Sequence, residues 1–325
     1  MTCTENYSKF KLISDFRNDQ ITNEIETNLK YWLDWCFLGI GAWGDVNIPT
    51  SGEYGNFHIL RYVNDAAYEN GQVWEGVRQD WVWETGVGFN DIGDNPEPIH
   101  ITGIQINDVS YSGNDSTYGW HINYPLGRVI FDTAISTTSD VQADYSYRYV
   151  QVYRADDAPW FRELQFASFK PNDGYFTQTD SGNWTIGGNH RVQLPAIVIE
   201  AVSRGNTAGY ELGNAALIIY QDVLFHVIAE NRYDRNNLID ILRQQSDKTI
   251  WLFNSSTMAN SGVFPLDYRG MLTGTLMYPD FVAENGYRHI KCTFENNTIS
   301  AIESIHPNLY EGVVRSTLSL VLGII

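Results

Sequence analysis

The stretch LPAIVIEAV, residues 194–202, indicates most clearly what kind of fold this sequence forms. A proline is followed by a short run of Ile, Val and Ala, a pattern typical of a strand buried in a sheet. The next apolar stretch, residues 209–230, predicts two further strands or one long bent strand. A helix is expected after it, because Asp234 stands at an N-cap position. The apolar positions of that helix are Leu238, Ile239, Ile241 and Leu242.

The rest of the chain continues as strands around this one helix. KTIWLF, residues 248–253, predicts the strand that follows the helix. Three more strands are expected in MLTGTLMYP (271–279), YRHIKCTFENNTISAIES (287–304) and VVRSTLSLVLGII (313–325). Strands with a helix among them predict an α+β domain. The final strand is apolar to its end, so it pairs either within its own sheet or with a strand of a neighbouring subunit.

The first predicted element is a helix within residues 15–40. Apolar residues recur there at spacings of three and four and form one stripe, whereas Glu24, Glu26 and Lys30 fall off it. The stripe consists of Ile21, Ile25, Leu29, Trp32, Leu33, Cys36, Phe37 and Ile40. Two roles stay open for this helix, packing on its own domain or docking to a partner.

A β-rich module is expected after the helix. Residues 42–98 predict long ordered loops with short strands, and clearer strand signals begin at residue 99, where Gly103 shifts the alternation and predicts a bulge. A strand, a turn at Pro125 and a second strand follow. A long strand is then predicted from Val141 to Tyr153. One face of it would carry Val141, Ala143, Tyr145, Tyr147, Tyr149, Gln151 and Tyr153, and tyrosines on a strand favour a half-wet surface such as an interface.

Residues 154–191 predict one ordered, extended arm between two domains. Pro, Gly and Asn interrupt the strand pattern there, yet the many aromatic rings need cover, which excludes a floppy linker. The expected organisation is a helix with a β-rich module in residues 1–153, the arm, and a mixed sheet-and-helix domain in residues 192–325. The predicted fold class is therefore α+β.

The segment GQVWEGVRQDWVWETGV, residues 71–87, is the densest aromatic stretch of the module. Burial of its rings, within the chain or against a neighbouring subunit, is favoured, because Trp, Tyr and Arg dominate protein interfaces. The alternatives are a sugar-binding platform and a glycosidase-like acid pair, drawn as Glu75 with Glu84 or as Asp80 among the tryptophans. The predicted interface residues are Trp74, Arg78, Trp81, Trp83, Tyr145, Tyr147, Tyr149, Trp160 and Phe161.

The composition favours a folded protein that assembles with others. Charged residues make up only 18% and aromatic residues 14%, as is typical of assembling surfaces. The net charge of −18 argues against binding DNA through phosphate neutralisation. An acidic channel wall would let DNA slide past, and the alternative is that the acidity only keeps the protein soluble. Three scattered cysteines predict synthesis in a reducing cytoplasm. The start shows no signal-peptide pattern, and the apolar runs are too short to span a membrane.

The sequence carries no motif for catalysis, nucleotide binding or a metal. The seven histidines form no HxH, HxxxH or HExxH pattern, and neither GxSxG nor GxxxxGK[ST] occurs. Asp91, Asp94 and Glu97 in NDIGDNPE (90–97) could hold calcium, but the twelve-residue EF-hand pattern is missing and a plain turn is favoured. No catalytic residue, cofactor site or metal site is therefore predicted.

Two longer stretches carry a resemblance to a known class of proteins. FLGIGAWGDVNIPTSGEYGNFHILRYVNDAAYENGQVWEGVRQDWVWETGV (37–87) and NYPLGRVIFDTAISTTSDVQADYSYRYVQVY (123–153) resemble virion structural proteins of tailed bacteriophages, the second a β module of neck and tail components. The C-terminal half is similar in layout to tail-terminator proteins. There LPAIVIEAV, the loop GNTAGYELG, the strand VLFHVIAE and the helix RNNLIDILRQQ precede further strands.

The resemblance implies a virion protein of the neck or tail that is not an enzyme and needs no cofactor. Such a protein forms a six-fold or twelve-fold ring that ends the tail and joins it to the head connector. Its partners would be its own copies and the neighbouring neck, tail-tube and sheath proteins, with genomic DNA as a non-specific passenger and no membrane. Assembly would take place in the host cytoplasm. The alternative is a tail-associated glycan-binding protein (an adhesin or fibre attachment) or a baseplate protein.

Overall fold

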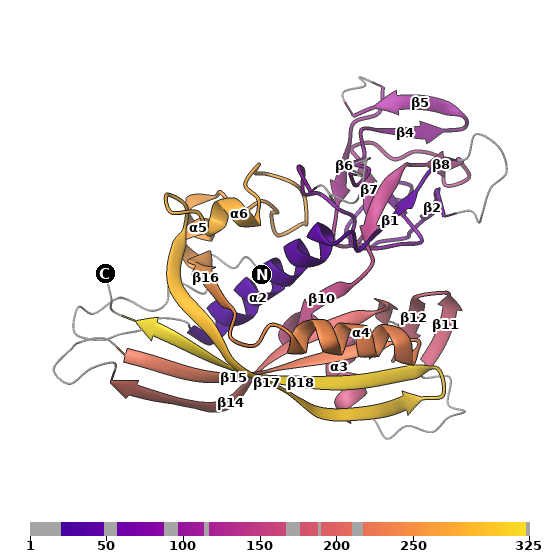
Figure 1. Ribbon diagram of the computed structural model, residues 1–325. Helices are drawn as coiled ribbons and strands as arrows, with labels where there is room; N and C mark the ends of the chain where they lie inside the picture. Colours follow the sequence, from indigo (N-terminus) through magenta and orange to yellow (C-terminus); the bar gives the residue numbers. More distant parts are fainter. Residues whose placement is uncertain are drawn as a thin grey trace, which may run out of the picture. The chain divides into compact units, whose positions relative to one another are not determined.

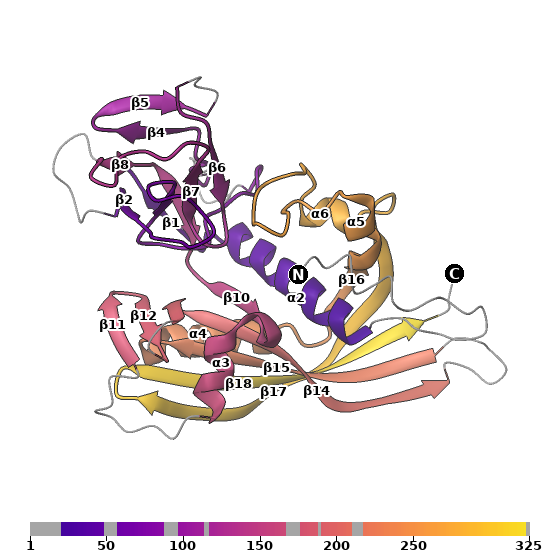
Figure 2. The ribbon, with the colours of Figure 1, turned by 180° about the vertical axis from the view of Figure 1, so that it is seen from behind.

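The computed structural model divides the chain into two compact units, drawn in Figures 1 and 2. It describes residues 21–48, 57–87, 97–113, 117–166, 176–187, 190–209 and 217–322. Unit 1 comprises Cys36–Tyr149 and Gly262–Met277; unit 2 comprises residues 21–35, Val150–Ser261 and Tyr278–Ile325. Strands dominate and helices are few, which confirms the expected α+β class.

This division differs from the one expected from sequence. The first helix, expected in the N-terminal module, belongs mainly to unit 2, and residues 262–277 return to unit 1. The arm predicted over residues 154–191 falls within unit 2. Local sequence patterns do not predict that a later segment belongs to an earlier unit, because tertiary contacts determine this assignment and local composition does not.

Unit 2 is built on a six-stranded sheet in the order β10-β14-β15-β18-β17-β16. Neighbouring strands are antiparallel, except that β10 runs parallel to β14. The strands are β10 (Gln151–Arg154), β14 (Ala196–Gly209), β15 (Leu217–Ala229), β18 (Leu309–Leu322), β17 (Arg288–His306) and β16 (Thr249–Phe253). The C-terminal strand β18 lies between β15 and β17, so it pairs within its own sheet.

The central pair of this sheet is β15 with β18. Its register is unbroken from Leu217 opposite Leu322 to Ala229 opposite Tyr310. Because side chains alternate along a strand, this register assigns every residue to one of two faces. One face, called here the covered face, carries the buried residues Val223, Phe225, Val227, Val314, Leu318 and Leu320. The opposite face, called the half-open face, carries the even-numbered residues of β15.

Helix α4 (Arg232–Arg243) packs on the covered face, on the opposite side of the sheet from α3 in Figures 1 and 2. Ile239 of this helix fits where Gly312 of β18 has no side chain, since a Cβ there would collide with it. The N-cap is Asn231, whose side chain accepts the N–H of Asp234 at 2.8 Å. The predicted cap at Asp234 is therefore wrong, because that residue lies in the first turn and donates to the cap.

Helix α2 (Ile21–Gly39) confirms, over its described part, the helix expected within residues 15–40. Trp32 packs on Phe294 of β17 with ring centroids 5.3 Å apart. Asn28 Nδ2 donates to the carbonyl of Phe253 at 2.9 Å, and its Oδ1 accepts the Phe253 N–H at 2.6 Å. Of the two roles left open, packing on its own unit is the one observed.

Two acidic residues of α2 depart from the prediction. Glu24 and Glu26 are each only 8% exposed, although they fall off the apolar stripe. Glu24 accepts the N–H of Ser255 at 3.0 Å, and Glu26 accepts the N–H of Ala201 at 2.8 Å. Burial raises the pKa of Glu26, and the bond from Ala201 opposes that shift. These carboxylates are buried because they satisfy backbone donors that would otherwise lack partners.

A second layer covers one end of the half-open face. It consists of η1 (Ala155–Asp157), α3 (Pro159–Phe166) and a three-stranded sheet of β11 (Phe176–Asp180), β12 (Asn183–Ile186) and β13 (His190–Gln193). Trp160 and Phe161 of α3 share a buried core with Val198 and Ile228 of the large sheet. The extended arm predicted over residues 154–191 is therefore wrong. Its described residues form short packed helices and strands.

Unit 1 is built on a seven-stranded sheet in the order β5-β4-β8-β2-β3-β7-β6, beside a separate pair of β1 and β9. The strands are β1 (Trp43–Val46), β2 (Ile59–Tyr62), β3 (Val73–Glu75), β4 (Gly103–Ile106), β5 (Val109–Ser112), β6 (Trp120–Asn123), β7 (Arg128–Phe131), β8 (Val141–Gln142) and β9 (Tyr145–Arg148). Short strands between loops are as predicted. The bulge predicted at Gly103 is wrong, because β4 pairs with β5 without a register shift.

The long strand predicted from Val141 to Tyr153 is also wrong. β8, β9 and β10 divide this stretch among three different sheets. Period-two alternation of aromatic and polar residues persists across the breaks, so the pattern alone does not reveal them. The strand predicted in MLTGTLMYP is wrong as well. Leu272 of this stretch forms only an isolated bridge with Leu266. The end of the stretch enters α6 (Tyr278–Phe281), and α5 (Ser255–Ser261) precedes it in the chain. None of the helices in the described ranges is long and apolar enough to cross a membrane.

The half-open face contains a paired acid, Asp222 of β15. Thr317 Oγ1 donates to its Oδ1 at 2.7 Å, and Arg315 Nε donates to its Oδ2 at 3.2 Å. Burial alone would raise the pKa of Asp222. The hydrogen bonds from Thr317 and Arg315 and the nearby arginine charges outweigh burial and hold the pKa below its ordinary value of 3.8.

We predict that Asp222→Asn lowers the free energy of unfolding by about 1–3 kcal/mol at pH 7. A carboxylate with a lowered pKa stabilises the fold above its unfolded pKa, and this contribution is lost as pH falls from about 4 through the folded pKa. Urea denaturation between pH 7 and pH 2.5 measures it, with the exposed Asp240→Asn as control. A difference between wild type and Asp222→Asn that stays constant down to pH 2.5 would contradict the assignment.

Candidate functional site

The rings of the tryptophan-rich segment, residues 71–87, are buried. Trp74 is 2% exposed, Trp81 0% and Trp83 4%. A sugar stacks on the open face of an aromatic ring, so these rings offer it no platform. The favoured interpretation of this segment is burial, within the chain or against a neighbouring subunit, and the structure shows burial within the chain.

Trp81 is the centre of this packing. Its ring stacks on Tyr145 with centroids 4.4 Å apart and an interplanar angle of 29°. Its Nε1 donates to the carbonyl of Arg78 at 2.8 Å. Gly127, in the left-handed region at φ 61°, approaches the same ring, and a Cβ there would lie 2.9 Å from Nε1. The segment, strand β9 and the turn before β7 are thus fixed around one indole.

Arg78 ties further rings into the same cluster. Its guanidinium carbon lies 5.0 Å from the ring centroid of Tyr147 and 5.6 Å from that of Phe57. The residue is only 9% exposed. Cation–π contacts gain strength when they are desolvated, so this arginine stabilises the interior of unit 1.

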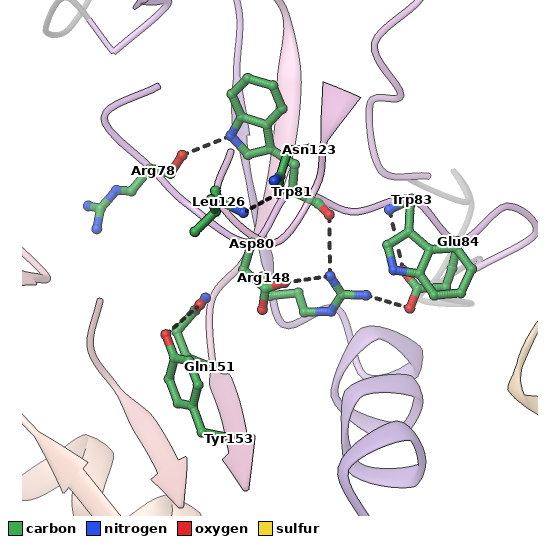
Figure 3. A network of polar contacts seen from close by, with 10 residues as sticks. All are labelled: Arg78, Asp80, Trp81, Trp83, Glu84, Asn123, Leu126, Arg148, Gln151 and Tyr153. Atoms are coloured by element: carbon green, nitrogen blue, oxygen red, sulfur yellow. Dashed lines mark hydrogen bonds and ion pairs between the residues drawn. The ribbon is translucent and has the colours of Figure 1, made fainter. Parts of the chain in front are cut away.

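Figure 3 shows Arg148 of β9 between two carboxylates of the segment. Nη1 donates to Asp80 Oδ1 at 3.0 Å and to the carbonyl of Trp81 at 3.3 Å, and Nη2 pairs with Glu84 Oε1. Arg148 is 3% exposed and Glu84 4%. Burial raises the pKa of Glu84, and the charge of Arg148 opposes that shift. The sequence analysis missed Arg148, because nothing in its local pattern marks it as a partner of residues more than sixty positions away.

The acids drawn as a glycosidase pair are held by arginines. Arg128 Nε donates to Glu75 Oε2 at 2.7 Å, while Glu84 and Asp80 both pair with Arg148. A catalytic acid and base must reach a glycosidic bond lying between them. Carboxylates closed around guanidinium groups do not meet that condition, so the cluster is a structural one.

The other predicted interface residues divide into buried and accessible ones. Tyr145 and Phe161 are 0% exposed and Trp160 is 4% exposed, whereas Tyr147 is half-buried and Tyr149 is 43% exposed. A side chain buried inside its own chain has no surface to offer a neighbour. The interface prediction is corrected on this ground for Trp74, Arg78, Trp81, Trp83, Tyr145, Trp160 and Phe161. For Tyr147 and Tyr149 it stays a prediction.

Unit 2 contains a histidine clamp that the sequence does not reveal. His226 Nδ1 lies 3.0 Å from Glu311 Oε1, and Nε2 lies 3.2 Å from Glu200 Oε2. Phe161 packs against the imidazole with ring centroids 4.7 Å apart. Both ring nitrogens therefore lie within hydrogen-bond distance of carboxylates. The clamp joins β14, β15 and β18 where the layer containing α3 lies on the sheet.

Beyond this clamp the half-open face presents a surface that the sequence analysis did not single out. The register places one residue of each of five strands in a single row, and a second row lies beside it. The first row is Trp251, Lys291, Val321, Ile218 and Ala208, and the second is Thr249, Thr293, Ser319, Tyr220 and Asn206. Trp251 is 37% exposed, Lys291 is exposed and Val321 is half-buried. This part, called here the open half-face, is the candidate interaction site.

The structure bears on the calcium alternative and on one of the cysteines. In the described ranges, no group of three His, Cys, Asp or Glu is arranged to hold a metal ion. The turn at residues 90–97, considered for calcium, lies outside the described residues except for Glu97. Burial raises the pKa of Cys292 to about 12, so this thiol does not supply a thiolate nucleophile.

We predict that Arg148→Met lowers the free energy of unfolding of unit 1 by about 3–5 kcal/mol, because it leaves the buried Glu84 without a counter-charge. Arg148→Met combined with Glu84→Gln should recover part of the loss. Chemical denaturation followed by tryptophan fluorescence measures both, with the exposed Arg61→Met as the matched control. Equal stability of the Arg148 and Arg61 variants would show that the ion pairs are not structural.

No protein-family model matches the sequence, and a search of curated proteins finds no match. The function is therefore argued from the chain's own residues, their burial and their charges.

Proposed function

We propose that this chain is a non-enzymatic structural protein of a phage virion, a neck or tail subunit that assembles into a ring. The observation that carries the proposal concerns β14 and β17, which lie next to the short edge strands β10 and β16 of the six-stranded sheet. The edge strands pair with β14 and β17 along only part of their length, so among the described residues the remainder of each forms an open edge of the sheet. Such edges are where another chain adds to a sheet.

The first edge is β14. β10 pairs with it from Ala196 to Ile199, and the N–H of Ala201 is taken by Glu26 of α2. Among the described residues no strand pairs with the rest of β14 on the side away from β15. Residues 204–209 are exposed on both faces, so this part of β14 is accessible to another chain.

The second edge is β17. β16 pairs with it only from Arg288 to Thr293, although β17 continues to His306. In the described part of unit 2, no strand pairs with the rest of β17 on the side away from β18. Register shifts against β18 interrupt this part three times. Bulges make an edge irregular, which favours one matching neighbour over indiscriminate pairing.

Two different edges on opposite sides of one sheet favour a ring over a two-fold dimer. A head-to-tail contact joins unlike surfaces, and successive copies close into a ring when the rotation between them permits. The succession of β14, β15, α4, β16, β17 and β18 follows the layout through which the sequence resembles tail terminators. The net charge of −18 suits a lumen through which DNA passes without sticking.

We predict that the purified protein forms a closed oligomer whose mass is a multiple of 37.0 kDa, six or twelve subunits, at micromolar concentration. Mass photometry or glutaraldehyde crosslinking gives the stoichiometry, and negative-stain images of particles show whether the ring lies at the neck. A wild-type protein that stays monomeric throughout the micromolar range would argue strongly against the proposal.

We further predict that Asn206→Pro and Thr207→Pro have different effects. Neighbouring residues of a strand point their N–H groups to opposite sides, so one substitution removes an outward donor of β14 and the other breaks a bond to β15. The outward variant should lose the oligomer and keep its melting temperature, whereas the inward variant should melt at a lower temperature. If neither variant shifts the oligomer, β14 is not a subunit contact.

A further inference from the structure

The two faces of the six-stranded sheet differ in what covers them. Cys292 and Leu320, on the covered face, are 0% exposed, and Trp32 of α2 packs in the next row on Phe294. Their chain neighbours Lys291 and Val321 point to the other side and are exposed and half-buried. Adjacent residues of the same strands therefore differ sharply in burial. Among the described residues, the open half-face is therefore the less covered side of this end of the sheet.

The open half-face has the chemistry of an interface centre. Aliphatic side chains of Ile218 and Val321 lie between Lys291 and the exposed end of β14. At the outer strand, Arg288 lies over the ring of Trp251 at 4.3 Å. Tryptophan and arginine beside aliphatic residues supply most of the binding energy at protein contacts.

Its charge is opposite to that of the chain as a whole. The chain has 39 acidic and 21 basic residues. The two rows of the open half-face carry the cation of Lys291 and no carboxylate. At their margin, the cations Arg204, Arg288 and Arg315 are balanced by the carboxylates Asp222, Glu284, Glu295 and Glu200. Asp222 is buried within its arginine pairs, while the Arg204 side chain is 76% exposed. A positive surface on so acidic a chain is complementary to the other surfaces of a second copy.

The symmetry of such a contact follows from the same charges. Two open half-faces set against each other would offer Lys291 no carboxylate within their two rows, which is unfavourable for that charge. The face therefore meets a different, acidic surface of the neighbour, and unlike surfaces in contact give a head-to-tail arrangement. Duplex DNA would also attract the cations. Ile218 and Val321 would contribute nothing to phosphate binding, which favours a protein surface.

We infer that the open half-face is the surface on which unit 2 receives an acidic, partly apolar surface of a second copy of this chain. The inference rests on the proposed function, since it names a contact that holds the ring together. It makes Lys291 the electrostatic centre of the contact and Trp251 its apolar anchor.

The test compares the full-length wild type with Lys291→Glu and Trp251→Ser by mass photometry and sedimentation at several concentrations. Each variant should raise the concentration at which the oligomer dissociates by about ten-fold or more. Raising the salt from 50 to 500 mM should weaken the oligomer of the wild type more than the oligomer of Lys291→Glu. Matched controls are Arg61→Glu, an exposed arginine of unit 1, and Tyr233→Ser, an aromatic residue 74% exposed on α4. Neither control substitution should change the concentration at which the oligomer dissociates.

The outcomes separate this inference from the proposed function. An oligomer that forms in wild type and is unchanged in both variants overturns the inference and leaves the ring intact. A monomeric wild type overturns both. A fluorescent 20-base-pair duplex that binds wild type at 150 mM salt, but not Lys291→Glu, would overturn the inference in favour of a DNA-contacting face. Equal melting temperatures of wild type and variants confirm that any loss of oligomer is not a loss of fold.

Discussion

The register of β15 against β18 is the constraint on which the rest of unit 2 depends. Its unbroken ladder fixes which side chains lie beneath α2 and α4 and which lie on the opposite side. A shift of β15 by one residue would move Phe225 to the half-open face and Asp222 into the apolar core, and a shift of β18 would do the same to Leu320 and Arg315. The covered face and the open half-face are therefore two consequences of one pairing.

The sequence predicts those parts of the fold whose signals are local. The strand at LPAIVIEAV, the helix before KTIWLF and the helix within residues 15–40 all appear, because apolar periodicity reflects burial on one face. The division of Val141–Tyr153 among three sheets could not be predicted, since its alternation continues through both breaks. The return of residues 262–277 to unit 1 depends on contacts distant in the sequence, and no local pattern encodes it.

The candidate site shows the same limit more strongly. Tryptophans in residues 71–87 attract attention as an interface, yet they serve the interior of unit 1, where Arg148 neutralises the acids beside them. A high frequency of aromatic residues in a sequence segment indicates that they are buried. It does not distinguish burial within the chain from burial against a neighbouring subunit. Residues of the open half-face, such as Lys291 and Ile218, are unremarkable in sequence. Only the cross-strand register brings them into one row.

Hydrogen exchange of the protein at dilute and at assembling concentrations tests the central claim, that the incompletely covered sheet of unit 2 is the assembly surface. The account predicts added protection of backbone amides in residues 204–209, 217–221 and 288–293 on assembly, with residues 71–87 unchanged because their rings are already buried. Protection confined to unit 1, or none in these strands while the oligomer forms, would contradict it.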